Sequence, residues 1–142
     1  MTKIKKNVIL WIGILSSIMV ISSCMVTRDV MPEGFEQVIE SFDKFAVEIR
    51  SVRYVVPQNT LSIDLTLNIN KTVQEDVSQL LSVLTEYFRT ELFVEFVEGI
   101  QEDNPEPFSI NLDIYNTNNE RTHMLGTDLS SNFGNWGGYF GE

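Results

Sequence analysis

Few side chains in this 142-residue sequence have the chemistry of a catalytic or metal-binding centre. His123 is the only histidine and Cys24 the only cysteine, so a serine or cysteine nucleophile would have one usual base available. No Gly-x-Ser-x-Gly segment is present to expose a serine on a sharp turn. Metal centres normally bring several His, Cys or Asp ligands together at close spacing, a pattern that is missing here. We therefore expect no metal and no cofactor, and we interpret His123 as a structural residue of a strand.

Carboxylates are the one abundant reactive group, with 20 Asp and Glu against 10 Lys and Arg and a net charge of −10. A pair of them could act as general acid and base, as in glycosidases. A hydrated acidic surface explains the same composition without any reaction. We expect the protein not to be an enzyme and keep a small carboxylate-dependent hydrolase as the alternative.

Two segments, 61–70 and 108–115, alternate apolar and polar residues with the period of two that is typical of a β-strand. If the apolar side chains of both face a layer of helices, the polar ones share the opposite, open face of the sheet. Such a face would be acidic, with short side chains suited to docking a protein. An ordinary hydrated sheet face is the other interpretation. The candidate partner-binding residues are Asp64, Thr66, Asn68, Asn111, Asp113 and Tyr115.

Apolar residues at helical spacing predict helices before and between these strands. The first runs from Phe35 to about Arg50 and is followed by a strand at 51–56. The second starts at a capping box, Thr72 with Glu75, and continues to residue 89. There the apolar stripe turns by roughly 160°, at ~100° per residue, so the chain must break near Thr90. We expect 91–100 to be a further helix, with a strand as the alternative.

A turn at 116–119 and a returning strand at 120–127 complete a second hairpin. This order predicts an α+β domain at 35–127, an antiparallel sheet of about four strands covered on one face by two or three helices. A tether at 24–34 would precede it, and a Gly-rich tail with four aromatic residues would follow at 128–142. We favour a tail that packs on the domain; an interaction segment and disorder are the alternatives.

The N-terminus has the three parts of an export signal. Lys3, Lys5 and Lys6 form a basic start, 8–21 is an apolar run, and small residues lead into Cys24. The apolar run is shorter than the ~20 residues that a membrane-spanning helix needs. A permanent transmembrane anchor is therefore the weaker interpretation.

The four residues Ile21-Ser22-Ser23-Cys24 resemble the lipobox of bacterial lipoproteins: an aliphatic residue, two small residues and cysteine. The resemblance covers the first 24 residues. It implies that 1–23 is a signal peptide, cleaved before Cys24, and that Cys24 carries the lipid, acyl chains such as palmitate. Two or three acyl chains hold a protein stably on a membrane. The expected location is the cell membrane or the outer membrane, with the domain outside the cytoplasm.

Without its signal the chain would carry seven Lys and Arg against 20 Asp and Glu, a net charge of −13. So acidic a protein is not expected to bind nucleic acid, and it suits a basic protein partner. We therefore expect a non-catalytic binding module on the cell envelope. An immunity-type lipoprotein that neutralises an exported toxin is one concrete version.

Overall fold

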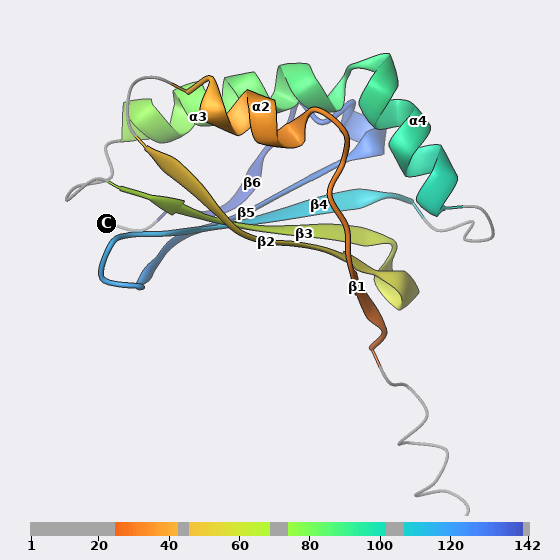
Figure 1. Ribbon diagram of the computed structural model, residues 1–142, viewed down its shortest axis with the longest axis horizontal. Helices are drawn as coiled ribbons and strands as arrows, with labels where there is room; N and C mark the ends of the chain where they lie inside the picture. The colour runs from red at the N-terminus through yellow and green to blue at the C-terminus, as the bar shows by residue number, and fades with distance from the viewer. Residues whose placement is uncertain (1–24, 43–45, 69–73, 102–106, 141–142) are drawn as a thin grey trace, which may run out of the picture.

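A single mixed sheet with helices on one face organises the molecule (Figure 1). The computed structural model describes residues 25–42, 46–68, 74–101 and 107–140. Within them, six strands form a sheet of order β1-β2-β3-β4-β5-β6. The strands are β1 (Thr27–Asp29), β2 (Val47–Val55), β3 (Thr60–Leu67), β4 (Ser109–Tyr115), β5 (Arg121–Asp128) and β6 (Gly137–Phe140). The helices are α2 (Phe35–Glu40), α3 (Gln74–Phe88) and α4 (Glu91–Ile100).

The α+β class is confirmed, but the expected antiparallel sheet of about four strands is wrong in two respects. The sheet has six strands, and its two central ones, β3 and β4, are parallel. The predicted hairpins β2–β3 and β4–β5 are both antiparallel, as expected. They meet in parallel because α3 and α4 cross over one face and return the chain to the end of the sheet where β3 began.

Both segments that we placed outside the domain contribute a strand to the sheet. Part of the expected tether forms β1, which pairs Arg28 with Tyr54 at the free edge of β2. The tail packs on the domain, as favoured. Its Phe133 is buried, and β6 pairs Gly138 with Leu125 at the other edge. The domain therefore extends beyond 35–127 in both directions.

The first helix is much shorter than predicted, because α2 ends at Glu40 and β2 begins at Val47. Ile49 satisfies the helical spacing counted from Phe35, but Val47 and Ile49 also alternate with polar neighbours, as in a strand. Pairing with β3 decides between the two periods, since Ile49 lies opposite Leu65 on the buried side of the sheet.

The break between the two later helices is confirmed, and 91–100 is a helix rather than a strand. Thr90 has an extended backbone and caps α4: its hydroxyl accepts from the Phe93 amide at 3.4 Å and donates to the Tyr87 carbonyl at 2.7 Å. Of the predicted capping box, Glu75 lies in the first turn of α3, and Thr72 lies outside the described residues.

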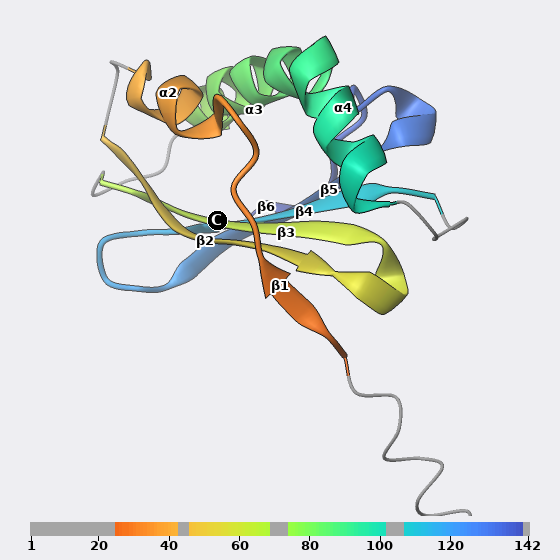
Figure 2. The ribbon, with the colours of Figure 1, turned by 45° about the vertical axis from the view of Figure 1, so that its right-hand side comes forward.

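The core lies between the sheet and the three helices (Figure 2). The two central strands and α3 supply its aliphatic part. Aromatic rings from α3, α4 and the tail pack beneath the α3–α4 junction; the centroids of Phe88 and Phe93 are 4.7 Å apart, and those of Phe93 and Phe133 are 5.9 Å apart. Four leucines on the apolar stripes of β3, α3 and β4 are fully buried: Leu65, Leu80, Leu84 and Leu112.

Candidate binding face on the open side of the sheet

The predicted polar residues of β3 and β4 lie side by side on the face of the sheet that the helices leave open (Figure 2). In the parallel register, Asp64 pairs with Asp113 and Thr66 pairs with Tyr115. Asn111, two residues before Asp113 on β4, is exposed beside Ser62 of β3. The last candidate, Asn68, is exposed just beyond the end of β3. The structure therefore brings five of the six residues into one array and puts the sixth at its end.

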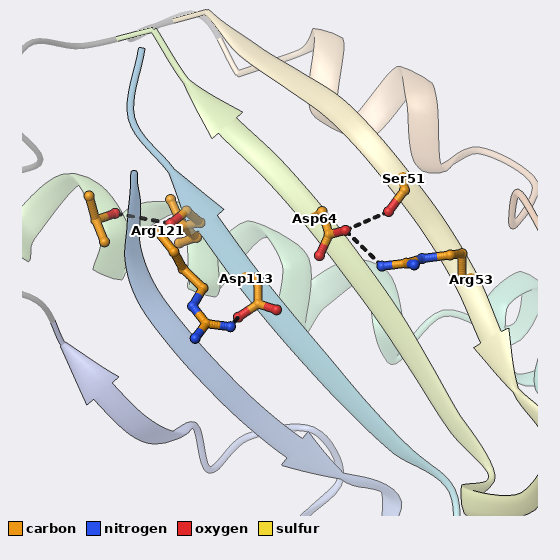
Figure 3. A network of polar contacts seen from close by, with 7 residues as sticks. Ser51, Arg53, Asp64, Asp113 and Arg121 are labelled. Atoms are coloured by element: carbon orange, nitrogen blue, oxygen red, sulfur yellow. Dashed lines mark hydrogen bonds and ion pairs between the residues drawn. The ribbon is translucent and has the colours of Figure 1, made fainter. Parts of the chain in front are cut away.

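Asp64 is held by two side chains from β2 (Figure 3). The Ser51 hydroxyl donates to its Oδ2 at 2.6 Å, and Arg53 Nη2 donates to the same oxygen at 3.0 Å. The Asp64 side chain is only 14% exposed, whereas Arg53 is 42% exposed. A charge-assisted pair of this kind fixes both side chains in place. A protein that binds here would therefore contact mainly the Arg53 side chain.

Asp113 lies in a different electrostatic environment, although it is the register partner of Asp64. Arg121 of β5 brings its Nη1 to 3.5 Å from Asp113 Oδ1 (Figure 3). Burial is the main cause that raises the pKa of Asp113; the charge of Asp64 raises it further, and Arg121 and Arg53 lower it. The second carboxylate therefore remains ionised less readily than a free aspartate.

A third arginine lies at one end of this array. Arg50, at the register shift of β2, places its guanidinium carbon 4.1 Å from the centroid of the Tyr115 ring, a cation–π contact. With Arg53 and Arg121, it turns the expected acidic face into one of mixed charge. The sequence reading missed these three side chains because it placed Arg50 in a helix and did not assign the other two to a face. The alternation of apolar and polar residues along β2 and β5 could have assigned these side chains to the open face.

The negative charge of the protein is instead concentrated on the helical layer. All charged residues within the helices α2, α3 and α4 are acidic, and none of the three has a basic residue in its last turn. The exposed ones are Glu36, Glu40, Glu75, Glu86, Glu91, Glu95 and Glu98.

His123 lies on the helix-facing side of the sheet, far from the candidate face. It pairs with Ile114 and is 4% exposed, and burial lowers the pKa of its imidazole. Its Nδ1 lies 2.9 Å from the Thr122 hydroxyl. Across the described ranges, no group of three or more His, Cys, Asp or Glu is placed to hold a metal ion.

The predicted lipidation residue Cys24 and the predicted signal peptide 1–23 lie outside the described residues. Among the helices that the structure describes, none is both long enough and apolar enough to cross a bilayer. Comparison of the chain with known protein families, with curated proteins and with solved structures gives no match. Function must therefore be inferred from the chemistry of the described surfaces.

Proposed function

We propose that the protein is a bacterial lipoprotein, anchored to the envelope through Cys24, whose domain binds a protein partner on the open face of its sheet. The lipobox supports the anchor, and the mixed-charge array on β2 to β5 supports the binding surface. The domain acts by occupying its partner rather than by transforming it. Neutralisation of an exported toxin by an immunity-type protein is a task of this kind, because it requires only a complementary surface.

The observation that carries this proposal is the pairing of each central carboxylate with an arginine from a neighbouring strand. Arg53 and Arg121 are about half exposed; Arg53 donates to Asp64 at 3.0 Å, and Arg121 forms an ion pair with Asp113 at 3.5 Å. A side chain that is already held loses less conformational entropy when a partner binds. Alternating charges also discriminate between partners, because a mismatch places like charges together. The face is therefore prepared to recognise a complementary charge pattern.

A substitution at Asn111 tests the face with the smallest effect on the fold. Asn111 is exposed on the same face, two residues before Asp113 on β4, so Asn111→Arg adds bulk and charge without removing an ion pair. Gln37→Arg makes the same change of charge on exposed α2, across the molecule, and is the matched control.

The partner is first identified by capture from cell-envelope extract with the full-length lipoprotein, and its affinity is then measured against salt. We expect Asn111→Arg to weaken binding by about tenfold or more, because it places bulk and charge inside the interface, and Gln37→Arg to leave it unchanged. Affinity should fall as salt rises, since the contacts are charged. Equal affinities for the two variants would show that the partner binds elsewhere.

The adjacent carboxylates favour one second candidate, a small carboxylate-dependent hydrolase. Asp64 is ion-paired, while burial raises the pKa of Asp113. A carboxyl group of raised pKa beside an ion-paired carboxylate is an arrangement that general acid–base catalysis can use. Under this candidate, Asp113→Asn abolishes a hydrolytic activity found by substrate screening and leaves partner affinity intact. Under the binding proposal, no substrate is turned over by the wild-type protein.

A further inference from the structure

A small apolar cleft lies on the helical side of the molecule, between α4 and the 3-10 turn Leu129–Ser131 that follows β5. Figures 1 and 2 show the ribbon of this turn beside α4. Its volume is about 220 Å³. Val97 and Phe133 are almost fully buried beneath it, at 4% and 1% exposure. Val94 and Leu129 stand exposed on its two sides, at 38% and 46%. The lining residues are Val94, Val97, Glu98, Gln101, Leu129 and Phe133.

The size of the cleft indicates what it can hold. Pockets for cofactors and other small molecules usually measure ~300–1,000 Å³, more than is present here. A smaller apolar cleft with exposed aliphatic walls suits one large side chain of another protein, as in the anchor pockets at the centre of interfaces. The occupant is therefore a peptide segment that inserts an aliphatic or aromatic side chain.

The charges around the cleft determine the rest of that segment. α4 exposes three glutamates, of which Glu98 lines the cleft. All charged residues of α4 are acidic, and Arg89, just before this helix, does not line the cleft and donates its Nε hydrogen to the Asn132 carbonyl at 2.8 Å. Negative charge along the α4 wall of an apolar cleft favours a cationic segment.

We propose that this cleft binds a lysine- or arginine-rich segment of a protein. The segment inserts an apolar side chain between Val94 and Leu129 and places its cations beside Glu98 and Glu95. This site goes beyond the open sheet face: it lies on the opposite layer and uses none of the same residues. It also gives a role to the exposed glutamates of α4, which the mixed-charge sheet face leaves unexplained.

The test uses a defined probe, a fluorescent lysine-rich peptide with one central phenylalanine, and the same peptide with serine in its place. Anisotropy is measured with the full-length lipoprotein in non-ionic detergent, with a micelle-only blank. We expect the phenylalanine peptide to bind about fivefold more tightly or better, because only it fills the cleft. Higher salt should weaken the binding of both peptides, because their cations contact carboxylates. Equal affinities for the two peptides, or no binding of either, overturn the proposal.

Two pairs of variants place the peptide on the molecule. Leu129→Ser changes the wall of the cleft, and Leu92→Ser is its control, since Leu92 is similarly exposed at 39% but lies outside the cleft. Glu98→Gln and Glu40→Gln form the second pair, each removing one exposed carboxylate from the helical layer. We expect only the first member of each pair to weaken binding of the phenylalanine peptide. For Leu129→Ser the affinity should fall by about fivefold.

Asn111→Arg on the open face should leave the affinity for the peptide unchanged, so that this site and the proposed sheet-face function can fail separately. Thermal unfolding checks that the serine variants are folded, and Glu98→Gln preserves the test if Leu129→Ser is not. Loss of affinity in Leu92→Ser equal to that in Leu129→Ser would mean that the peptide does not use the cleft.

Discussion

The two aspartates of the candidate face, Asp64 and Asp113, differ in their hydrogen bonds and electrostatic environment because their neighbouring side chains differ. Asp64 and Asp113 share a residue type, a face and a register position, yet one is held by Ser51 and Arg53, whereas burial raises the pKa of the other. A change at Asp64 acts on folding as well as on binding, because it leaves Arg53 without its anion. Exposed Asn111 has no such coupling, and binding experiments there report on binding alone.

His123 predicts a pH dependence of stability at the same scale. Burial lowers the pKa of its imidazole below the ordinary 6.5, so the unfolded chain takes up the proton first as the pH falls. The free energy of unfolding should therefore decrease below about pH 6.5, by at most ~1.4 kcal/mol per pH unit for one proton. This change in the free energy of unfolding can be measured by urea unfolding of the wild type and of His123→Gln between pH 7.5 and pH 5.5.

The informative quantity is the difference between the two proteins across that range. His123→Gln cannot be protonated, so its stability should decline less than that of the wild type, whatever its stability at pH 7.5. Parallel curves would mean that His123 has the same proton affinity in the folded and unfolded chains. The raised pKa of Asp113 acts in the opposite direction: its contribution to stability is lost as the pH rises through its folded pKa.

Among the elements, the tail shows how a polar, Gly-rich sequence becomes part of a folded domain. The indole of Trp136 donates to the Thr85 hydroxyl at 2.9 Å, and that hydroxyl donates to the Phe133 carbonyl at 3.2 Å. Arg89 reaches the same turn from the end of α3. These contacts attach residues 132–136 of the tail to α3. They lie just before β6 in the chain and so place β6 next to β5.

Gly138 is the position in β6 where a side chain should be least tolerated. Its φ is +145°, and a Cβ there would overlap the Met124 carbonyl oxygen of β5. We expect Gly138→Ala to lower the free energy of unfolding by ~1–3 kcal/mol, through backbone strain and lost pairing. Urea unfolding measures the change.

Gly99→Ala is the matched control, because it lies in α4 with nothing within 4 Å of its Cβ position. Alanine is the better helix former by ~1 kcal/mol, so this variant should be as stable as the wild type or more stable. A Gly138→Ala protein with wild-type stability would show that β6 can shift away from β5 at no cost.

Considered as a whole, the molecule divides its charge between two surfaces. The helical layer exposes acidic residues, while the open sheet face carries arginines paired with its central carboxylates. A protein built in this way can meet two partners, or two parts of one partner, with different charge patterns. The lipid anchor that we propose at Cys24 would keep both surfaces at the cell envelope.

The anchor is tested by Cys24→Ala in the full-length chain. Without its thiol the protein has no site for the lipid, so acyl labelling should disappear and the protein should remain an uncleaved precursor or be released. Ser23→Ala is the control, since it keeps a small residue before the cysteine and should be labelled normally. Normal labelling and membrane retention of Cys24→Ala would refute the lipoprotein assignment.

Local patterns in the sequence were sufficient to identify β3, β4, α3 and the start of α4. Segments 60–67 and 109–115 alternate because one face of each strand is buried, and the change of stripe near Thr90 marks a real break because a straight helix has one apolar side. The buried leucines follow from the same periodicities. These features depend on residues close together in the chain, where the pattern is complete.

Only the tertiary structure decided the strand order, the parallel join of β3 with β4, the start of β2 and the two edge strands. Strands of three and four residues, such as β1 and β6, are too short to display a period, and pairing is a contact between distant segments. Arg53 and Arg121 reach the candidate face through that pairing. The charge of the surface therefore depended on strand register, which no single segment of the sequence contains.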